Sequence, residues 1–140
     1  MMTNVVRYLT HPQVNIDPSI PVPHWGLSEV GTARTEAVTA TGLLSGTTRV
    51  ISSGERKAIE TAEIIAAKLG VDVEVREAMH ENDRSATGFL IPDEFEAVAD
   101  QFFGQPHVSV RGWEKRSTPN CVLFKRSSTC WRATRRAMCF

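Results

Sequence analysis

The stretch of sequence that decides the fold is SSGERKAIETAEIIAAKLG, residues 52–70. Its apolar residues recur at the spacing of one helix face and are Ile59, Ala62, Ala66 and Leu69. Ser52 followed three residues later by Glu55 is the pattern of a capping box, in which each side chain accepts a hydrogen bond from a free amide of the first turn. Gly70 suits the left-handed residue that often ends a helix. The stretch therefore predicts a capped amphipathic helix.

Candidate strands flank this helix on both sides. Residues 48–51 and 71–75 are short segments rich in β-branched residues, and residues 4–10 (NVVRYLT) have the same character. A second helix, capped by Ser28 and reaching about Ala40, lies between the candidate strands 4–10 and 48–51. Strands that alternate with helices are typical of parallel sheets with right-handed crossovers, so the sequence predicts an α/β fold.

Two further segments complete the organisation. Residues 12–27 contain four prolines, which prevent regular structure, and loops of this length inside a domain are often functional. Pro92 and Asp93 open a helix that we expect to end near Gly104, after a polar loop over residues 76–91.

Length and composition limit the class of protein. The chain has 140 residues, of which 41% are hydrophobic and 23% charged, and this fits one globular domain or a piece of one. No apolar run approaches the roughly 20 residues that span a bilayer. The first residues lack the pattern of a secretory signal, so we expect a cytoplasmic protein with no membrane partner.

The net charge of zero conceals two segments of opposite charge. Residues 1–114 hold all 16 acidic residues and 9 of the 16 basic ones, a net charge of −7, whereas residues 115–140 carry +7 and all three cysteines. The second segment shows no convincing helical or strand period. We interpret residues 1–114 as the α/β domain and residues 115–140 as a basic tail. This tail is a native arm, a disordered segment or the product of a shifted reading frame.

The residues with chemical potential follow the predicted strands, where ligands bind in parallel α/β sheets. His11 follows the first strand, Arg56 and Lys57 lie at the helix start after the second strand, and Glu81 follows the third. A nucleophilic imidazole, an anion site made of helix amides and cations, and a carboxylic acid together suit phosphoryl transfer.

Three segments resemble the histidine phosphatase superfamily, which has the phosphoglycerate mutase-like fold. Residues 27–31 (LSEVG) resemble its LTELG segment, residues 52–66 (SSGERKAIETAEIIA) resemble its SSxxxRAxxTAxxIA helix, and residues 79–82 (MHEN) resemble the segment with its acid. The second motif is the specific one, and the resemblance covers roughly residues 5–114. It implies a three-layer α/β sandwich with a mainly parallel sheet, which we expect to be incomplete at the C-terminus.

Carried over residue by residue, the resemblance implies that His11 is the phospho-accepting nucleophile and Glu81 the general acid that protonates the leaving alkoxide. The residues that it implies for substrate binding are Thr10, Ser53, Arg56 and Lys57. It implies neither a metal nor another cofactor.

The sequence departs from the family's pattern at three places. The family's first strand ends in RHG, whereas residues 10–12 read THP, so a threonine stands where an arginine grips the phosphate. Lys57 keeps the charge of the family's second phosphate arginine but loses its bidentate fork. The family's second histidine, in a GHG motif, has no counterpart, and residues 115–140 stand in its place.

The leading hypothesis is a phosphomonoesterase or mutase-like enzyme that acts through phosphohistidine and is impaired in this form. Its substrate would be a phosphorylated small molecule or a phosphoprotein. The alternative is a domain that binds a phosphoester or phosphoprotein without turnover. A third hypothesis makes residues 115–140 an arm for nucleic acid or another anionic partner, with Trp131 available to stack between arginines, but nucleic acid is not the partner we expect.

Overall fold

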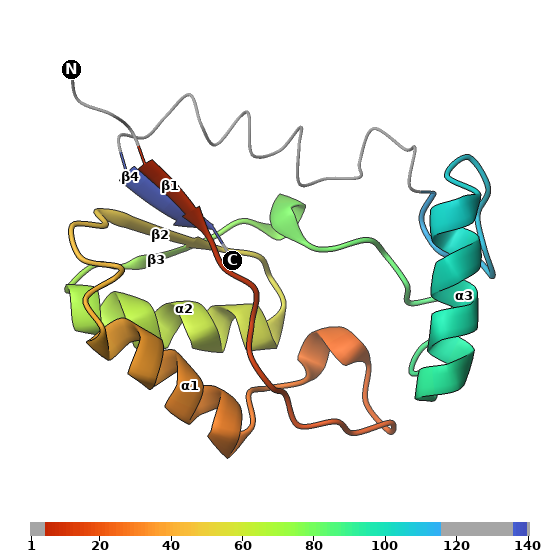
Figure 1. Ribbon diagram of the computed structural model, residues 1–140, viewed down its shortest axis with the longest axis horizontal. Coiled ribbons are helices and arrows are strands. Elements are labelled where there is room, and N and C mark those ends of the chain that lie inside the picture. Colours follow the sequence, from red (N-terminus) through yellow and green to blue (C-terminus); the bar gives the residue numbers. More distant parts are fainter. Residues whose placement is uncertain (1–4, 116–135, 140) are drawn as a thin grey trace.

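Figure 1 shows the chain as a computed structural model, which describes residues 5–115 and 136–139. In chain order the elements are β1 (Val5–Tyr8), the short 3-10 helix η1 (Val22–His24), α1 (Glu29–Ala40), β2 (Arg49–Ser52), α2 (Arg56–Leu69), β3 (Val73–Val75), the short 3-10 helix η2 (Glu77–Met79), α3 (Pro92–Gly104) and β4 (Arg136–Cys139). Strands and long helices alternate up to β3, which confirms the predicted α/β fold.

The four strands form one parallel sheet in the order β1-β4-β2-β3. Val5 of β1 pairs with Arg136 of β4, and Arg49 of β2 pairs with Ala137 on the other side of the same strand. β2 and β3 are also parallel. The carboxyl ends of all four strands therefore lie at the same edge of the sheet, from which the connecting segments leave (Figure 1).

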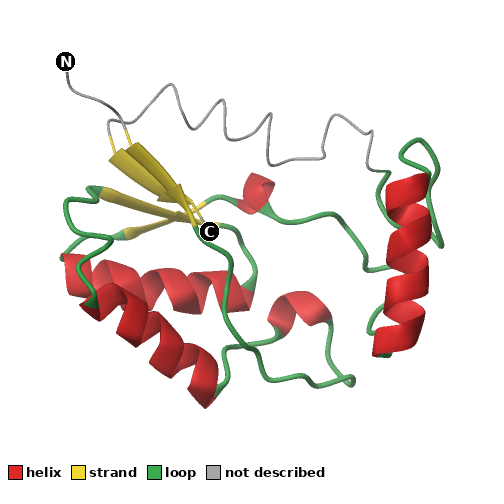
Figure 2. Ribbon diagram, in the orientation of Figure 1, coloured by secondary structure: helices red, strands yellow, loops and turns green. Residues whose placement is uncertain are grey.

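Helices α1 and α2 form a layer on one face of the sheet, as Figure 2 shows. The buried residues of this core are Leu44, Val50, Ala58, Ala62, Ile65 and Ala66. As predicted, the Ser28 hydroxyl caps α1 by accepting from the Gly31 amide at 3.1 Å, and Gly70 ends α2 in the left-handed conformation with φ 69°. No helix in the described part of the chain has both the length and the apolarity needed to cross a membrane.

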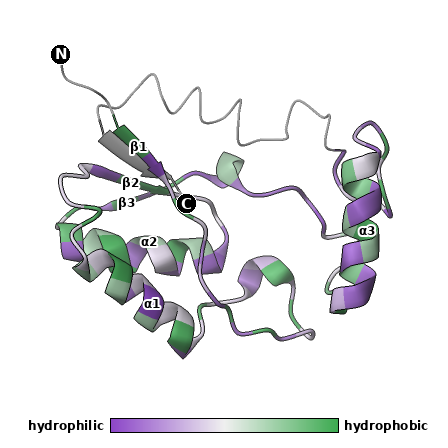
Figure 3. Ribbon diagram, in the orientation of Figure 1, coloured by the Kyte–Doolittle hydropathy of each residue, from purple (hydrophilic) through white to green (hydrophobic). Residues whose placement is uncertain are grey.

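Helix α3 lies apart from the sheet and has a core of its own (Figure 1). The buried residues of this second core are Val98, Phe102, Val110 and Trp113. Polar and apolar residues alternate along α3 in Figure 3, as expected for a helix that buries one face. The Glu114 amide donates to the Asp83 carbonyl at 2.8 Å, so the two ends of segment 83–114 lie together. We call this segment the α3 unit. The ring of Phe89 touches Trp25 of the 12–27 loop, with 5.8 Å between ring centroids.

The start of α2 differs from the predicted capping box. Ser52 is the last residue of β2, and its hydroxyl donates to the Ser53 carbonyl at 2.9 Å instead of capping the helix. Glu55 is the residue before the first helical turn, and no side chain caps it. The prediction was wrong because strand pairing holds Ser52: its carbonyl accepts from the Arg76 amide, just after β3, at 2.7 Å.

Of the basic tail, residues 115 and 136–139 are described. Residues 136–139 form β4, a strand that the sequence did not predict, and it lies between β1 and β2. The interpretation of the rest of the tail lies outside the described residues.

Candidate phosphate-binding site

The parallel sheet brings the segments with the candidate residues to one edge. Thr10 and His11 follow β1, Ser53 follows β2 directly, and Glu81 follows β3 and η2 (Figure 1). Arg56 and Lys57 form the first turn of α2, and substrate anions are favoured at such helix starts because free backbone amides point outward there.

His11 is held by its own loop. The ring atom Nδ1 lies 2.8 Å from the Pro12 carbonyl oxygen. Because a carbonyl oxygen only accepts, the Nδ1 proton must be the donor, and in the neutral imidazole this leaves the lone pair on Nε2. The half-buried His11 side chain thus has one nitrogen fixed by the backbone and one with nucleophilic capacity, while neighbouring Thr10 is exposed.

Lys57 is buried and paired with an acid. Its side chain is only 6% exposed, and Nζ lies 2.6 Å from Oε2 of Glu55, whose side chain is 14% exposed. Ser53, the other candidate at this turn, is also buried. The cation that the resemblance assigns to the phosphate therefore already has a carboxylate partner.

Arg56 has a different role in the structure. Its Nε atom donates to Oε1 of Glu60 at 2.7 Å, and Oε2 of Glu60 accepts from the Leu27 amide at 2.6 Å. Gly26 allows this approach, since a Cβ atom there would lie 2.9 Å from both Glu60 oxygens. Glu60 thereby fixes both Arg56 and the end of the 12–27 loop on α2.

The 12–27 loop is held by further contacts. The Asn15 amide donates to the Gly26 carbonyl at 3.0 Å, beside the antiparallel bridge between Val14 and Leu27. Trp25 is buried, and its indole Nε1 donates to the Asp17 carbonyl at 2.9 Å. The loop that follows His11 is thus built around its own hydrogen bonds.

Glu81 lies on the segment that leads to α3. Its side chain is 50% exposed, and Oε2 accepts from Nη2 of Arg84 at 3.0 Å. The Arg84 guanidinium lies over the rings of Phe95 and Trp113, at 5.5 and 5.7 Å from their centroids. Glu81 therefore pairs with Arg84 and, through it, contacts the aromatic core of the α3 unit.

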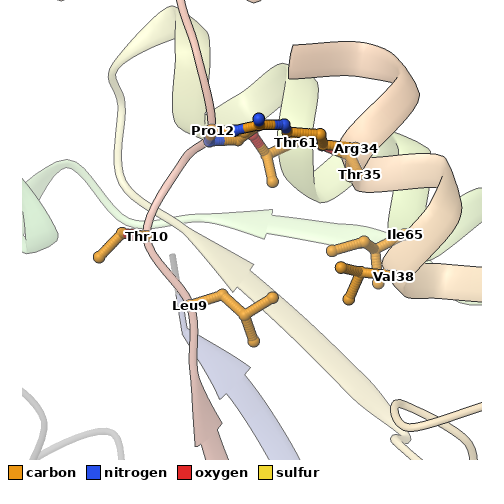
Figure 4. A pocket seen from close by; sticks show the side chains of 8 residues that line it. All are labelled: Leu9, Thr10, Pro12, Arg34, Thr35, Val38, Thr61 and Ile65. Atoms are coloured by element: carbon orange, nitrogen blue, oxygen red, sulfur yellow. The ribbon is translucent and has the colours of Figure 1, made fainter. Parts of the chain in front are cut away.

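A cavity of about 240 Å³ lies between the segment after β1 and the two helices (Figure 4). Thr10 and Pro12, the neighbours of His11, line it together with residues of α1 and α2 that include Arg34 and Thr61. The Thr61 hydroxyl donates to the Lys57 carbonyl at 2.7 Å, so it is not a donor to the cavity. Most of the remaining wall is apolar, which does not suit a phosphate.

Sequence reasoning missed three acids near the candidate site. Glu60 was detectable, because it lies four residues after Arg56 on the same helix face. Glu55 was assigned to a capping box, which hid its pairing with Lys57. Glu77 approaches Gly54 from a different part of the chain, and its carboxylate occupies the space that a Cβ atom on Gly54 would need. No sequence signal indicated that contact.

Among the described residues, no three His, Cys, Asp or Glu side chains form a group able to hold a metal ion.

The fold and the family are established by comparison with known proteins. The family model of the histidine phosphatase superfamily (branch 1) matches residues 21–116, more than half of the chain. The chain therefore belongs to the histidine phosphatase superfamily. Ser53, Arg56, Lys57 and Glu81 lie inside the matched range, and His11 precedes it. A search of curated proteins gives no significant match.

Solved structures share the fold at low sequence identity. A mycobacterial glucosyl-3-phosphoglycerate phosphatase is 16% identical with a TM-score of 0.72, and the match covers 96% of this chain and 70% of that one. YhfR of Bacillus stearothermophilus is 16% identical with a TM-score of 0.73, over 96% and 71% of the two chains. The putative phosphohistidine phosphatase SixA of Agrobacterium tumefaciens is 22% identical with a TM-score of 0.50, over 69% and 60%.

Proposed function

We propose that the chain is a phosphomonoesterase that forms a phosphohistidine at His11. The observation that carries the proposal is the hydrogen bond from Nδ1 to the Pro12 carbonyl, which leaves Nε2 as the nucleophile at the sheet edge. Membership of the histidine phosphatase superfamily supports the same reaction class.

The proposed reaction has two steps. Nε2 of His11 attacks phosphorus, a P–N bond forms, the P–O bond to the leaving group breaks, and the Glu81 carboxyl group protonates the leaving alkoxide. Water then attacks the phosphohistidine, the P–N bond breaks, and the Glu81 carboxylate takes the proton. Inorganic phosphate leaves, and both residues return to their starting states.

The proposed substrate is a phosphorylated small molecule or a phosphoprotein. Two structural neighbours support these classes, since one is a glucosyl-3-phosphoglycerate phosphatase and another a putative phosphohistidine phosphatase. We further propose that turnover is slow in this form. Thr10 offers no cation to the phosphate, and both cations of the α2 start are paired with acids of the chain itself.

Hydrolysis of a fluorogenic phosphomonoester tests the proposal. We expect His11→Ala to abolish turnover and Glu81→Gln to reduce kcat by about 10²–10⁴-fold, the usual contribution of a positioned proton donor. His107→Ala is the matched control, because His107 is also a histidine but is exposed and lies after α3. Equal hydrolysis by wild type and the His11→Ala variant would exclude His11 as nucleophile.

The second candidate function is binding of a phosphoester or phosphoprotein without turnover. The threonine at position 10, where the family has an arginine, and the lack of a counterpart to the family's second histidine favour it, because both changes remove groups that support turnover. Calorimetry with small phosphoesters separates the two functions. Binding without hydrolysis supports the second candidate, whereas the absence of binding excludes it.

A further inference from the structure

Lys57 is the one charged residue that the described part of the chain buries. It lies in the first turn of α2, where free backbone amides add to the positive potential. A buried ammonium group needs a compensating charge, because removal from water strongly disfavours an isolated ion. In this chain the compensating charge is the Glu55 carboxylate, 2.6 Å away and itself largely buried.

A second carboxylate approaches the same turn independently. Glu77 belongs to η2, after β3, and its carboxylate packs directly against Gly54 in the β2–α2 connection. Gly54 is the residue before Glu55, so the Glu77 carboxylate lies against the short connection from which Glu55 reaches Lys57. One acid comes from the connection itself and the other from a segment more than twenty residues later.

We propose that Glu55 sets the phosphate affinity of this site by neutralising Lys57, and that Glu77 adds to the effect. The proposal rests on the proposed function, which places the phosphate of the substrate at the start of α2. A phosphate group must share Lys57 with Glu55 or displace it, and it meets repulsion from both carboxylates. Glu55 is thus a specificity-determining residue that lowers the affinity for strongly charged phosphoesters.

The expected consequence is that neutral substitutions tighten phosphate binding. In Glu55→Gln the side chain keeps its length but loses its charge, which leaves Lys57 with an uncompensated positive charge beside the helix amides. Close charge pairs couple strongly in buried settings, so we expect the Kd for inorganic phosphate to fall by at least about tenfold. Glu77→Gln should tighten binding by a smaller factor, since Glu77 is exposed to solvent.

Titration calorimetry with inorganic phosphate makes the comparison. Glu63→Gln is the matched control, because Glu63 is an exposed residue of the same helix and the substitution changes the net charge by the same amount. We expect the control to bind phosphate within about twofold of wild type, since an exposed charge is screened by salt. Unchanged or weaker binding by a folded Glu55→Gln variant would overturn the proposal, as would an equal gain in the control.

Loss of a partner from a buried ion pair is destabilising, so circular dichroism must show that the variant is folded. If Glu55→Gln does not fold, a phosphate titration of the wild-type protein followed by NMR tests whether Lys57 and Glu55 respond to phosphate. We expect the carboxyl carbon resonance of Glu55 and the ammonium nitrogen resonance of Lys57 to move together as inorganic phosphate is added. If neither resonance moves at saturating phosphate, Lys57 is not the phosphate ligand and the proposal fails.

The outcomes are distinct from those of the catalytic test. A protein whose His11 never becomes phosphorylated still shows tighter phosphate binding on Glu55→Gln if the inference holds. The converse result is that turnover depends on His11 while Glu55→Gln, Glu77→Gln and Glu63→Gln all bind phosphate with the affinity of the wild type. That result would retain the proposed function and contradict the inference.

Discussion

The glycine of the LSEVG segment, Gly31, shows how one residue fixes the position of the loop after His11. The backbone carbonyl of Gln13 occupies the space that a Cβ atom on Gly31 would need. The same carbonyl accepts hydrogen bonds from the Ser28 amide at 3.0 Å and from the Ser28 hydroxyl at 3.2 Å. Only glycine at position 31 permits this approach, which connects the loop to the start of α1.

We predict that Gly31→Ala destabilises the protein by about 1–3 kcal/mol, because a backbone carbonyl must move and the added methyl overpacks a buried site. The measurement is the free energy of unfolding in urea. Gly104→Ala is the control: apart from its chain neighbours and the backbone of its own helix, no atom lies within 4 Å of its Cβ position, at the end of α3. We expect that variant to be neutral or stabilised by up to about 1 kcal/mol. Equal losses in the two variants would contradict the steric explanation.

At the candidate site, the sequence identified which residues reach the sheet edge but not how they are paired. The parallel arrangement was enough to place His11, Lys57 and Glu81 on segments that leave one edge. The partners of these residues depend on tertiary approach, as with Glu60, whose contact to the Leu27 amide joins residues 33 positions apart. Glu55 and Lys57 are two residues apart, a spacing that does not face within a helix. They meet because Glu55 is still extended, with φ −75° and ψ 136°.

Among the elements, α2 shows both the strength and the limit of pattern reasoning. Its apolar spacing and Gly70 correctly predicted a helix packed on the sheet, because these features act within a few residues. Its start was misplaced because Ser52 has two possible partners, the helix amides and the neighbouring strand. In the structure Ser52 is the last residue of β2, and it pairs with Val75 of β3.

The pairing of β2 with β3 is reinforced by a charged pair. Arg49 of β2 donates two hydrogen bonds to the Glu74 carboxylate of β3, from Nε to Oε1 at 2.5 Å and from Nη2 to Oε2 at 2.6 Å. This contact lowers the pKa of Glu74 from its ordinary value of 4.5 to about 2, with a smaller contribution from Arg76. A lowered pKa means that the folded state binds the Glu74 proton more weakly than the unfolded state.

We therefore predict a pH-dependent contribution of Glu74 to stability. It is fully present above pH 4.5 and is lost as the pH falls toward 2, where the folded carboxylate is protonated. Because both side chains are partly exposed, Glu74→Gln should lower the stability at neutral pH by up to about 1 kcal/mol.

Thermal unfolding between pH 2 and pH 7 measures this contribution. The wild type and Glu74→Gln should converge toward pH 2. Glu96→Gln, which removes an exposed carboxylate on α3, should run parallel to the wild type. A constant difference between wild type and Glu74→Gln across the pH range would contradict the assignment.

In the molecule as a whole, the described residues form two separate cores, one between the sheet and helices α1 and α2 and one around α3. Much of the sheet core under α1 and α2 was predictable, because α2 has a clear apolar period, Ser28 caps α1, and β1, β2 and β3 are rich in β-branched residues. The α3 unit was predicted only as a helix, since its packing on Val110 and Trp113 depends on the chain returning after Gly104. Strand β4 was not predicted because residues 136–139 (RAMC) have no distinctive pattern. These residues form a strand through pairing with β1 on one side and β2 on the other, which the sequence does not reveal.

The parallel sheet carries the loop of His11, the start of α2 and the segment of Glu81 to one edge. We propose that phosphoryl transfer through His11 takes place at this edge. The direct measurement is mass spectrometry of the protein after brief exposure to a small-molecule phosphoryl donor. We expect one added phosphoryl group that maps to His11, survives alkali and is lost in acid. The label should persist in His107→Ala and be absent from His11→Ala. Labelling of His11→Ala to the same extent as wild type, or no labelling of wild type, would contradict the proposal.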